Sequence, residues 1–159
     1  MRPTKGEYYL EIARAVSQRG TCRRRKYGAV LVSDDEIKGT GYVGSPRGAM
    51  NCIDKGFCPR QEAGIPAGER YDECNGVHAE QNVIISVSRK DALNGTLYIF
   101  GEDLEKDDPH FNFGPCQLCK RMIINTGIGL VITGNLAGDK KSYRVSHWLC
   151  DDSLEIKTK

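Results

Sequence analysis

Two short motifs that lie far apart along the chain constrain its fold more than any other feature. The first is V-H-A-E at residues 77–80, and the second is P-C-Q-L-C at residues 115–119. Zinc in a catalytic site takes three protein ligands and keeps a fourth position open for water. His78, Cys116 and Cys119 supply one imidazole and two thiolates, so a shared zinc ion requires that both motifs meet in the fold.

Each motif precedes a segment in which apolar residues recur at helical spacing, residues 81–87 after the first motif and residues 118–123 after the second. Pro115 lies just before the second segment, where proline favours the start of a helix. We therefore expect His78 and Cys116 at the N-termini of two helices. The positive end of a helix dipole stabilises thiolates and the hydroxide that zinc forms from water.

Glu80 lies two residues after His78 and is not needed as a ligand. A carboxylate beside the water on zinc is suited to act as general base and then as general acid. H-x-E followed by P-C-x-x-C is the pattern of zinc deaminases that act on nucleobases. A lone histidine or a lone C-x-x-C has many structural explanations. Their conjunction predicts a zinc-dependent hydrolytic deaminase with Glu80 as its catalytic residue.

The length and composition exclude several other classes of protein. At 159 residues the chain is expected to form a single domain, residues 1–159. Its net charge of +2 is too small to indicate nucleic-acid binding. It has neither an apolar run of about 20 residues nor an apolar N-terminal signal region. Seven cysteines, an odd number, indicate metal ligands in a reducing compartment. We therefore expect a cytoplasmic protein that does not bind membranes.

The hydrophobic pattern predicts strands that alternate with helices, which is typical of an α/β sheet. The first helix should run from Thr4, as its N-cap, to Arg19, just before Gly20. Residues 49–76 should form a long irregular segment, which in a compact domain is functional or tied down. The other expected helices are 78–90, 116–126 and 139–149, and the expected strands are 27–33, 36–43, 96–100, 128–132 and 154–157.

With these motifs the chain resembles the deoxycytidylate (dCMP) deaminase family, within the cytidine deaminase-like superfamily. The resemblance spans residues 21–132. It rests on C-x-R-R at 22–25 before G-A, on G-Y-x-G-S-P-R-G at 41–48, on H-A-E-Q-N at 78–82 and on the P-C-x-x-C motif followed by K-R-M-I-I-N. The resemblance implies a three-layer α/β/α sandwich around a five-stranded mixed sheet, and usually a hexamer. Some members are activated by dCTP and inhibited by dTTP, so the prediction includes Mg²⁺ with a nucleotide effector.

The resemblance also implies which residues bind a small-molecule nucleotide substrate. Arg24 and Arg25 match the family's arginines, and guanidinium groups bind a 5′-monophosphate in bidentate fashion. Arg47 is a further candidate for the phosphate, and the Ala79 backbone matches a contact for the amine. On composition alone, the basic run at residues 23–26 favours a solvated turn instead.

Two residues near the expected substrate pocket depart from the family pattern. Val43 stands where the family usually has an asparagine that helps to hold the nucleotide. Tyr27 stands where the family usually has valine. Val43 removes a polar partner, and Tyr27 adds bulk and a hydroxyl group. A modified cytosine nucleotide therefore becomes an alternative to dCMP as the substrate.

Three further interpretations differ in substrate or in class of protein. The same chemistry could act on a polynucleotide, such as an adenosine in tRNA, but the low net charge and the lack of an extended basic, aromatic surface argue against it. A deaminase of free nucleosides or bases would leave Arg24 and Arg25 without a phosphate. A non-enzymatic, zinc-stabilised binding module would have a closed metal site, in which Glu80 has no role.

Four further cysteines lie in or beside the long irregular segment. Four thiolates would close a tetrahedral structural zinc site, and some relatives carry a second zinc in this region with mixed cysteine and histidine ligands. The alternative is a set of buried, unpaired thiols, which are common in proteins. Cys150 is expected in the core. The predicted second-zinc ligands are Cys22, Cys52, Cys58 and Cys74.

Overall fold

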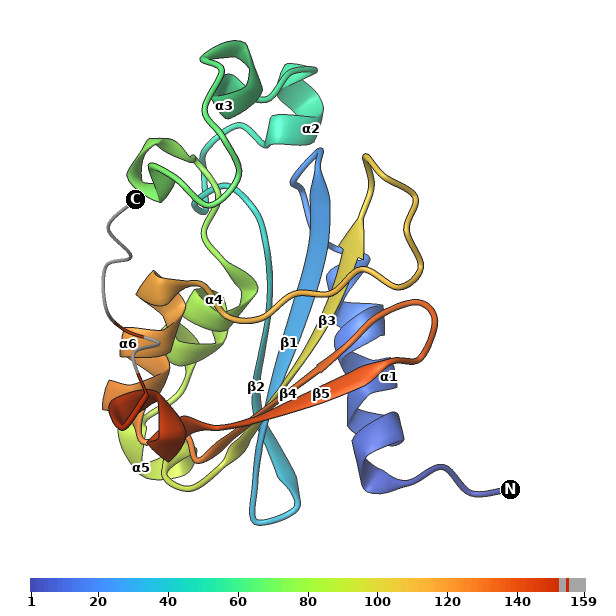
Figure 1. The fold of residues 1–159 in the computed structure, drawn as a ribbon, viewed down its shortest axis with the longest axis vertical. Coiled ribbons are helices and arrows are strands. Elements are labelled where there is room, and N and C mark those ends of the chain that lie inside the picture. Colours follow the sequence, from blue (N-terminus) through green and yellow to red (C-terminus); the bar gives the residue numbers. More distant parts are fainter. Residues whose placement is uncertain (152–153, 155–159) are drawn as a thin grey trace.

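The computed structural model describes residues 1–151 and Leu154 of the chain. Its centre is a five-stranded sheet in the order β2-β1-β3-β4-β5, in which β3 and β4 are parallel and the other neighbours are antiparallel (Figure 1). The expected five-stranded mixed sheet is confirmed. Its strands are β1 (Arg25–Ser33), β2 (Glu36–Tyr42), β3 (Thr96–Asp103), β4 (Leu130–Gly134) and β5 (Lys140–Arg144).

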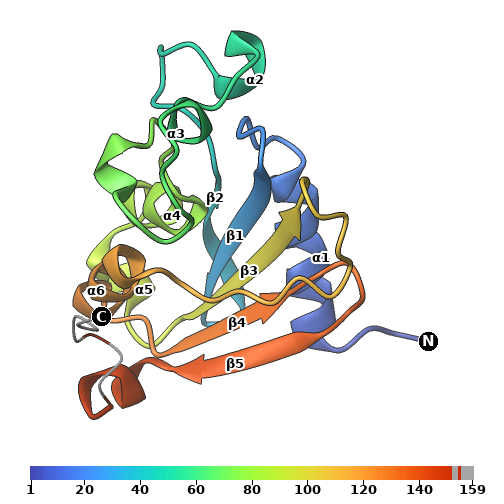
Figure 2. The ribbon, with the colours of Figure 1, turned by 45° about the horizontal axis from the view of Figure 1, so that its top comes forward.

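Helices cover both faces of this sheet, which gives the three expected layers. One helix packs against one face, and three helices pack against the other (Figures 1 and 2). The first is α1 (Lys5–Ser17), and the other three are α4 (Ala79–Ser86), α5 (Arg89–Ala92) and α6 (Gln117–Thr126).

The inner strand β1, which lies between β2 and β3, contributes to the core on both faces, because successive side chains of a strand point in opposite directions. Leu31 is fully buried in the core cluster that contains α4 and α6 residues. Val30 and Val32 are buried with Tyr9 and Leu10 of α1 on the other face. A strand buried on both sides is a rigid support for groups placed at its end.

Two glycines allow the helices to approach the sheet closely. A Cβ atom at Gly28 would lie 2.1 Å from the Ala13 carbonyl oxygen in α1. A Cβ atom at Gly41 would lie 2.5 Å from the Ala79 carbonyl oxygen, at the start of α4. Only a residue without a side chain fits such contacts. Gly41 therefore determines how near the N-terminus of α4 lies to β2.

The long segment predicted to be irregular contains three short helical turns (Figure 2). Its anchor is Arg60, which is only 5 % exposed and donates hydrogen bonds to the carbonyl oxygens of Pro66 at 2.9 Å and Arg70 at 2.6 Å. The segment is thus tied down by backbone contacts more than by apolar burial. The turns are α2 (Cys52–Lys55), α3 (Pro59–Glu62) and η1 (Tyr71–Glu73).

The prediction of a helix over residues 139–149 is wrong. Residues Lys140–Arg144 form the edge strand β5, and a 3₁₀ helix, η2 (Val145–Leu149), follows. Pairing with β4 favours the strand conformation, because β5 forms hydrogen bonds with backbone N–H and C=O groups of β4 that would otherwise lack partners. The sheet's fifth strand is therefore β5. Except for Leu154, the strand expected at 154–157 lies outside the described residues.

Two smaller predictions also need correction. The helix expected over residues 78–90 breaks at Val87, which is extended, and Ser88 then caps the separate helix α5. Cys150 is exposed, not part of the core. No helix within residues 1–151 is both long enough and apolar enough to cross a bilayer.

Candidate metal centre and active-site cavity

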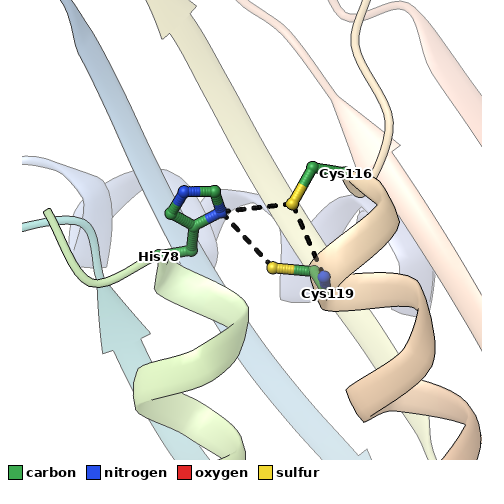
Figure 3. A group of neighbouring side chains, drawn as sticks. All are labelled: His78, Cys116 and Cys119. Carbon is green, nitrogen blue, oxygen red and sulfur yellow. Dashed lines mark hydrogen bonds between the residues drawn. The ribbon is translucent and has the colours of Figure 1, made fainter. Parts of the chain in front are cut away.

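The three metal ligands predicted from the two motifs meet where α4 and α6 begin (Figure 3). His78 is the N-cap residue of α4, and Cys116 is the N-cap residue of α6. His78 Nδ1 lies 3.5 Å from Cys116 Sγ and 3.4 Å from Cys119 Sγ. Across residues 1–151, no other group of three or more histidine, cysteine or carboxylate residues brings its ligand atoms within 4.8 Å of one another.

These distances suit a zinc ion. Bonds of about 2.0 Å to nitrogen and about 2.3 Å to sulfur, at a tetrahedral angle, place the two ligand atoms about 3.5 Å apart. The two nitrogen–sulfur distances, 3.5 and 3.4 Å, agree with this separation. One nitrogen and two sulfurs also form the donor set of a zinc site that leaves a fourth position for another ligand.

The electrostatics of the group favour a thiolate. Hydrogen bonding from Cys119, together with His78, lowers the pKa of Cys116 to about 4. The backbone N–H of Cys119 also lies 3.5 Å from the Cys116 sulfur, as expected at a helix N-terminus. The Cys119 thiol is fully buried and keeps its proton in this arrangement, since its pKa is raised. A divalent cation would replace that proton between the two sulfurs.

Glu80 lies in the first turn of α4, two residues after His78. It is only 8 % exposed, yet it lines the same cavity as His78 and Cys116. Burial raises the pKa of its carboxyl group, and the nearby His78 opposes this shift. Within the described residues Glu80 forms no ion pair, and its side chain hydrogen-bonds to Cys119 of the metal-binding group.

One cavity joins the metal-binding group to the start of β1. It is bounded by the loop before β1, by the segment from α2 to α4 and by the residues just before α6. Several residues singled out in the sequence lie on its wall, namely His78, Glu80, Cys116, Arg24, Arg25, Tyr27 and Val43.

Arg24 and Arg25, the predicted phosphate ligands, line this cavity but are each paired with an acid. Arg24 Nε donates to Glu105 at 2.9 Å. Arg25 Nη1 donates to Asp103 at 2.8 Å and to Glu105 at 3.2 Å. Each arginine side chain is 20 % exposed. Two of the four basic residues, Arg24 and Arg25, thus belong to a partly buried ion-pair network, whereas Arg23 is exposed.

Two other predicted substrate residues, Arg47 through its side chain and Ala79 through its backbone, are not part of the cavity wall. Arg47 is exposed and is not part of the cavity wall. Ala79 is fully buried in the core, with its carbonyl oxygen facing Gly41. The structure thus leaves Arg24 and Arg25 as the stronger candidates for a substrate's phosphate.

The two residues that depart from the family pattern are neighbours in the cavity wall. The Val43 N–H donates to the Tyr27 carbonyl oxygen at 3.1 Å. The Tyr27 ring meets Phe113 edge-on, with ring centres 5.1 Å apart. Burial, followed by the proximity of Glu80, raises the pKa of the Tyr27 hydroxyl. Tyr27 thus lies on the wall close enough to Glu80 to influence which substrates fit.

The four cysteines of the predicted second zinc site all line the same cavity. Burial raises the pKa of Cys74, and the nearby Cys22 and Cys52 add to the shift. Their ligand atoms are not gathered as closely as those of the metal-binding group at α4 and α6. The structure therefore brings these thiols to one region without assembling a closed site.

Two residues of the cavity wall escaped the sequence analysis. Arg60 lies over the Tyr71 ring at 5.1 Å, and the Tyr71 ring meets the His78 ring edge-on at 5.3 Å. Both come from the segment predicted to be irregular. A signal was available in the sequence, because an arginine and a tyrosine flank its glycine- and proline-containing part, but spacing alone does not show that they face His78.

The fold and the donor set define the class of protein: a zinc-dependent hydrolase of the deaminase type. A sequence model of the cytidine and deoxycytidylate deaminase zinc-binding region matches residues 3–135. The chain belongs to this family.

Individual relatives agree with this assignment. The deoxycytidylate deaminase of Mycobacterium phage D29 is 38 % identical, over 82 % of this chain and 94 % of the relative. That of Schizosaccharomyces pombe is 32 % identical over 82 % of this chain, which spans only 37 % of the relative's length. The solved dCMP deaminase of cyanophage S-TIM5, in complex with dCMP and dUMP, superimposes with a TM-score of 0.57. It is 26 % identical, over 85 % of this chain and 84 % of that one.

Proposed function

We propose that this protein hydrolyses dCMP to dUMP and ammonia. The observation that carries the proposal is a single cavity lined by a zinc-type ligand group, by Glu80 and by the pair Arg24 and Arg25. The first two features suit hydrolytic removal of an amine, and the arginines suit a 5′-phosphate. Relatives that bear the name deoxycytidylate deaminase support this choice of substrate.

Three residues would hold the metal, and one would move protons. His78, Cys116 and Cys119 would bind zinc, which when bound supplies the Lewis acidity that makes water a nucleophile near neutral pH. Glu80 would take a proton from that water and deliver it to ring N3 of cytosine. After attack at C4, Glu80 would take the proton of the new C4 hydroxyl group and pass it to the amino group, which leaves as ammonia while C4 becomes a carbonyl carbon. Water and dCMP are consumed, and dUMP and ammonia are formed.

An ammonia-release screen tests the proposal. The zinc-loaded protein would be assayed with dCMP, CMP, dCTP, deoxycytidine, 5-substituted dCMPs and tRNA, with Glu80→Gln as the matched inactive control. We expect the highest kcat/KM with dCMP. Preference for a 5-substituted dCMP would assign the modified-nucleotide alternative, and preference for deoxycytidine would assign the nucleoside alternative. A zinc-loaded protein that releases ammonia from none of them would contradict an enzymatic role.

We also propose a second, structural zinc held by Cys22, Cys52, Cys58 and Cys74. All four line the same cavity; three of them lie in the segment from α2 to α4, which has few apolar anchors, and Cys22 lies just before β1. Metal analysis should give two zinc ions per wild-type chain and one in Cys52→Ser, whereas Cys150→Ser, at an exposed thiol, should keep two. One zinc in all three proteins would refute the second site.

Three further expectations remain predictions, two from the family resemblance and one from the composition and cysteine content of the chain. They are the hexamer, the Mg²⁺ that would accompany a nucleotide effector, and the cytoplasmic location. Sedimentation velocity, with and without dCTP and Mg²⁺, would test the first two.

A further inference from the structure

The two arginines expected to bind a substrate phosphate already have carboxylate partners, and these two carboxylates differ in burial and in how firmly they are held. Asp103 is the last residue of β3 and is only 2 % exposed. Its Oδ1 atom accepts hydrogen bonds from Arg25 at 2.8 Å and from the backbone N–H groups of Glu105 and Lys106 at 2.9 and 3.2 Å. Asp103 is therefore a fixed partner of Arg25.

Glu105 is a displaceable partner. It lies in the turn after β3, and its side chain is 33 % exposed. Its contacts are made through side chains: Arg24 at 2.9 Å, Arg25 at 3.2 Å and the amide of Gln61 in α3. A rotation about its own side-chain bonds would release both arginines without moving the strand. In both views the loop after β3 lies beside the start of β1, where these arginines are (Figures 1 and 2).

Charge counting shows what this displacement would do. With Glu105 in place, two arginines face two carboxylates, and the group is neutral. With Glu105 displaced, Asp103 alone remains, and the group carries one net positive charge on the cavity wall. A phosphate dianion beside a retained Glu105 would meet a like charge at close range, which disfavours binding.

We infer that Glu105 occupies the phosphate position on Arg24 and Arg25 and is displaced from it only by a ligand that carries a phosphate. An uncharged nucleoside gains nothing by displacing Glu105, whereas a monophosphate replaces one carboxylate by a dianion with three acceptor oxygens. Displacing Glu105 costs free energy that phosphate binding has to supply, so Glu105 weakens the binding of the correct substrate. When no substrate is bound, Glu105 keeps the two arginines paired. This inference rests on the proposed function.

Variants that remove the charge of Glu105 test it. For the zinc-loaded protein, the Kd for inorganic phosphate would be measured by calorimetry, and kcat and KM would be measured with dCMP and with deoxycytidine. Glu105→Gln should lower the Kd for phosphate and the KM for dCMP by about three- to tenfold, the scale of a partly exposed ion pair. The kcat for dCMP and both constants for deoxycytidine should stay within about twofold, the reproducibility of such assays. The difference should shrink at 1 M salt, where screening is strong.

Asp107→Asn is the matched control, because it removes the same charge two residues further along the turn. Asp107 makes no hydrogen bond or ion pair with either arginine in the described part of the chain, so its effect should be less than twofold. Glu105→Asp keeps the charge and should keep the Kd for phosphate close to the wild-type value.

Two results would overturn the inference. The first is a Kd for phosphate that is unchanged or higher in Glu105→Gln, which would show that Glu105 only holds the arginines in position. The second is an equal gain with deoxycytidine, which would show a general loosening of the cavity. If the wild type does not deaminate dCMP, the proposed function fails by itself. The phosphate titration, which needs no turnover, still decides the role of Glu105.

Discussion

The metal-binding end of the cavity and its outer wall are built in different ways. At the metal-binding end, Cys119 and Ala79 are fully buried. Helices α4 and α6 begin beside a sheet whose inner strand β1 is buried on both faces. The outer wall consists of short turns and ion pairs, in which Arg60 holds its own segment together and Glu105 joins α3 to the loop before β1. A rigid end suits catalysis, because making and breaking bonds requires that the reacting groups are held in fixed positions. A wall of exchangeable polar contacts suits substrate selection.

The largest expected effect lies at the rigid end. Glu80→Gln keeps the shape of the side chain but removes proton transfer, so kcat should fall roughly 100- to 10,000-fold. Zinc content and circular dichroism should match the wild type, because the three predicted ligands are untouched. A variant that retains more than about a tenth of the wild-type kcat would remove Glu80 from the mechanism.

The next effect lies in the wall and should depend on the substrate. Arg24→Ala removes a charged hydrogen bond to phosphate, which is worth roughly 1.5–3 kcal/mol, so kcat/KM for dCMP should fall about 10- to 150-fold. Residual activity on deoxycytidine should hardly change. Arg19→Ala, at an exposed arginine beyond α1, is the control. Equal losses on both substrates would show that Arg24 supports the wall and not the phosphate. Arg25→Ala is less informative, since it strips buried Asp103 of its ion pair.

A weaker effect should follow from releasing the segment that Arg60 anchors. Arg60→Ala deletes two hydrogen bonds to backbone carbonyls, and each bond of a charged group contributes about 1.5–3 kcal/mol. The lost stability should appear as more frequent local opening of this segment, because a segment can open without unfolding of the whole protein. Local opening is measured as faster proteolytic cleavage between residues 62 and 72. Lys55→Ala, in the same segment, is the control. If the variant instead loses zinc and unfolds as a whole, the wall is not independent of the metal-binding end.

The smallest effect lies outside both regions. Thr4 caps α1, and its capping box pairs with Glu7. Thr4→Ala should cost about 1 kcal/mol of unfolding free energy, or about 2–4 °C in Tm, without changing kcat.

The backbone N–H of Thr4, followed by Lys140, lowers the pKa of Glu7 to about 2. The contribution of Glu7 is therefore complete above its ordinary pKa of 4.5 and is lost as the pH falls toward 2. An equal pH dependence of Tm in Glu7→Gln would contradict this assignment.

The sequence by itself determined the chemistry of the metal centre. Ligand type, spacing and the helix starts at His78 and Cys116 are local features, and local hydrogen bonding and dipoles act within a few residues. The first helix and the two strands of the β1–β2 hairpin could be predicted for the same reason, since the spacing of apolar residues reports the local conformation. The five-stranded mixed sheet was expected from the family resemblance. Tertiary structure decided what depends on partners distant in sequence. Lys140–Arg144 became a strand because β4 offers open backbone groups, against a helical pattern. Glu105 came to pair with Arg24 because long-range packing alone fixes which charges share a cavity wall.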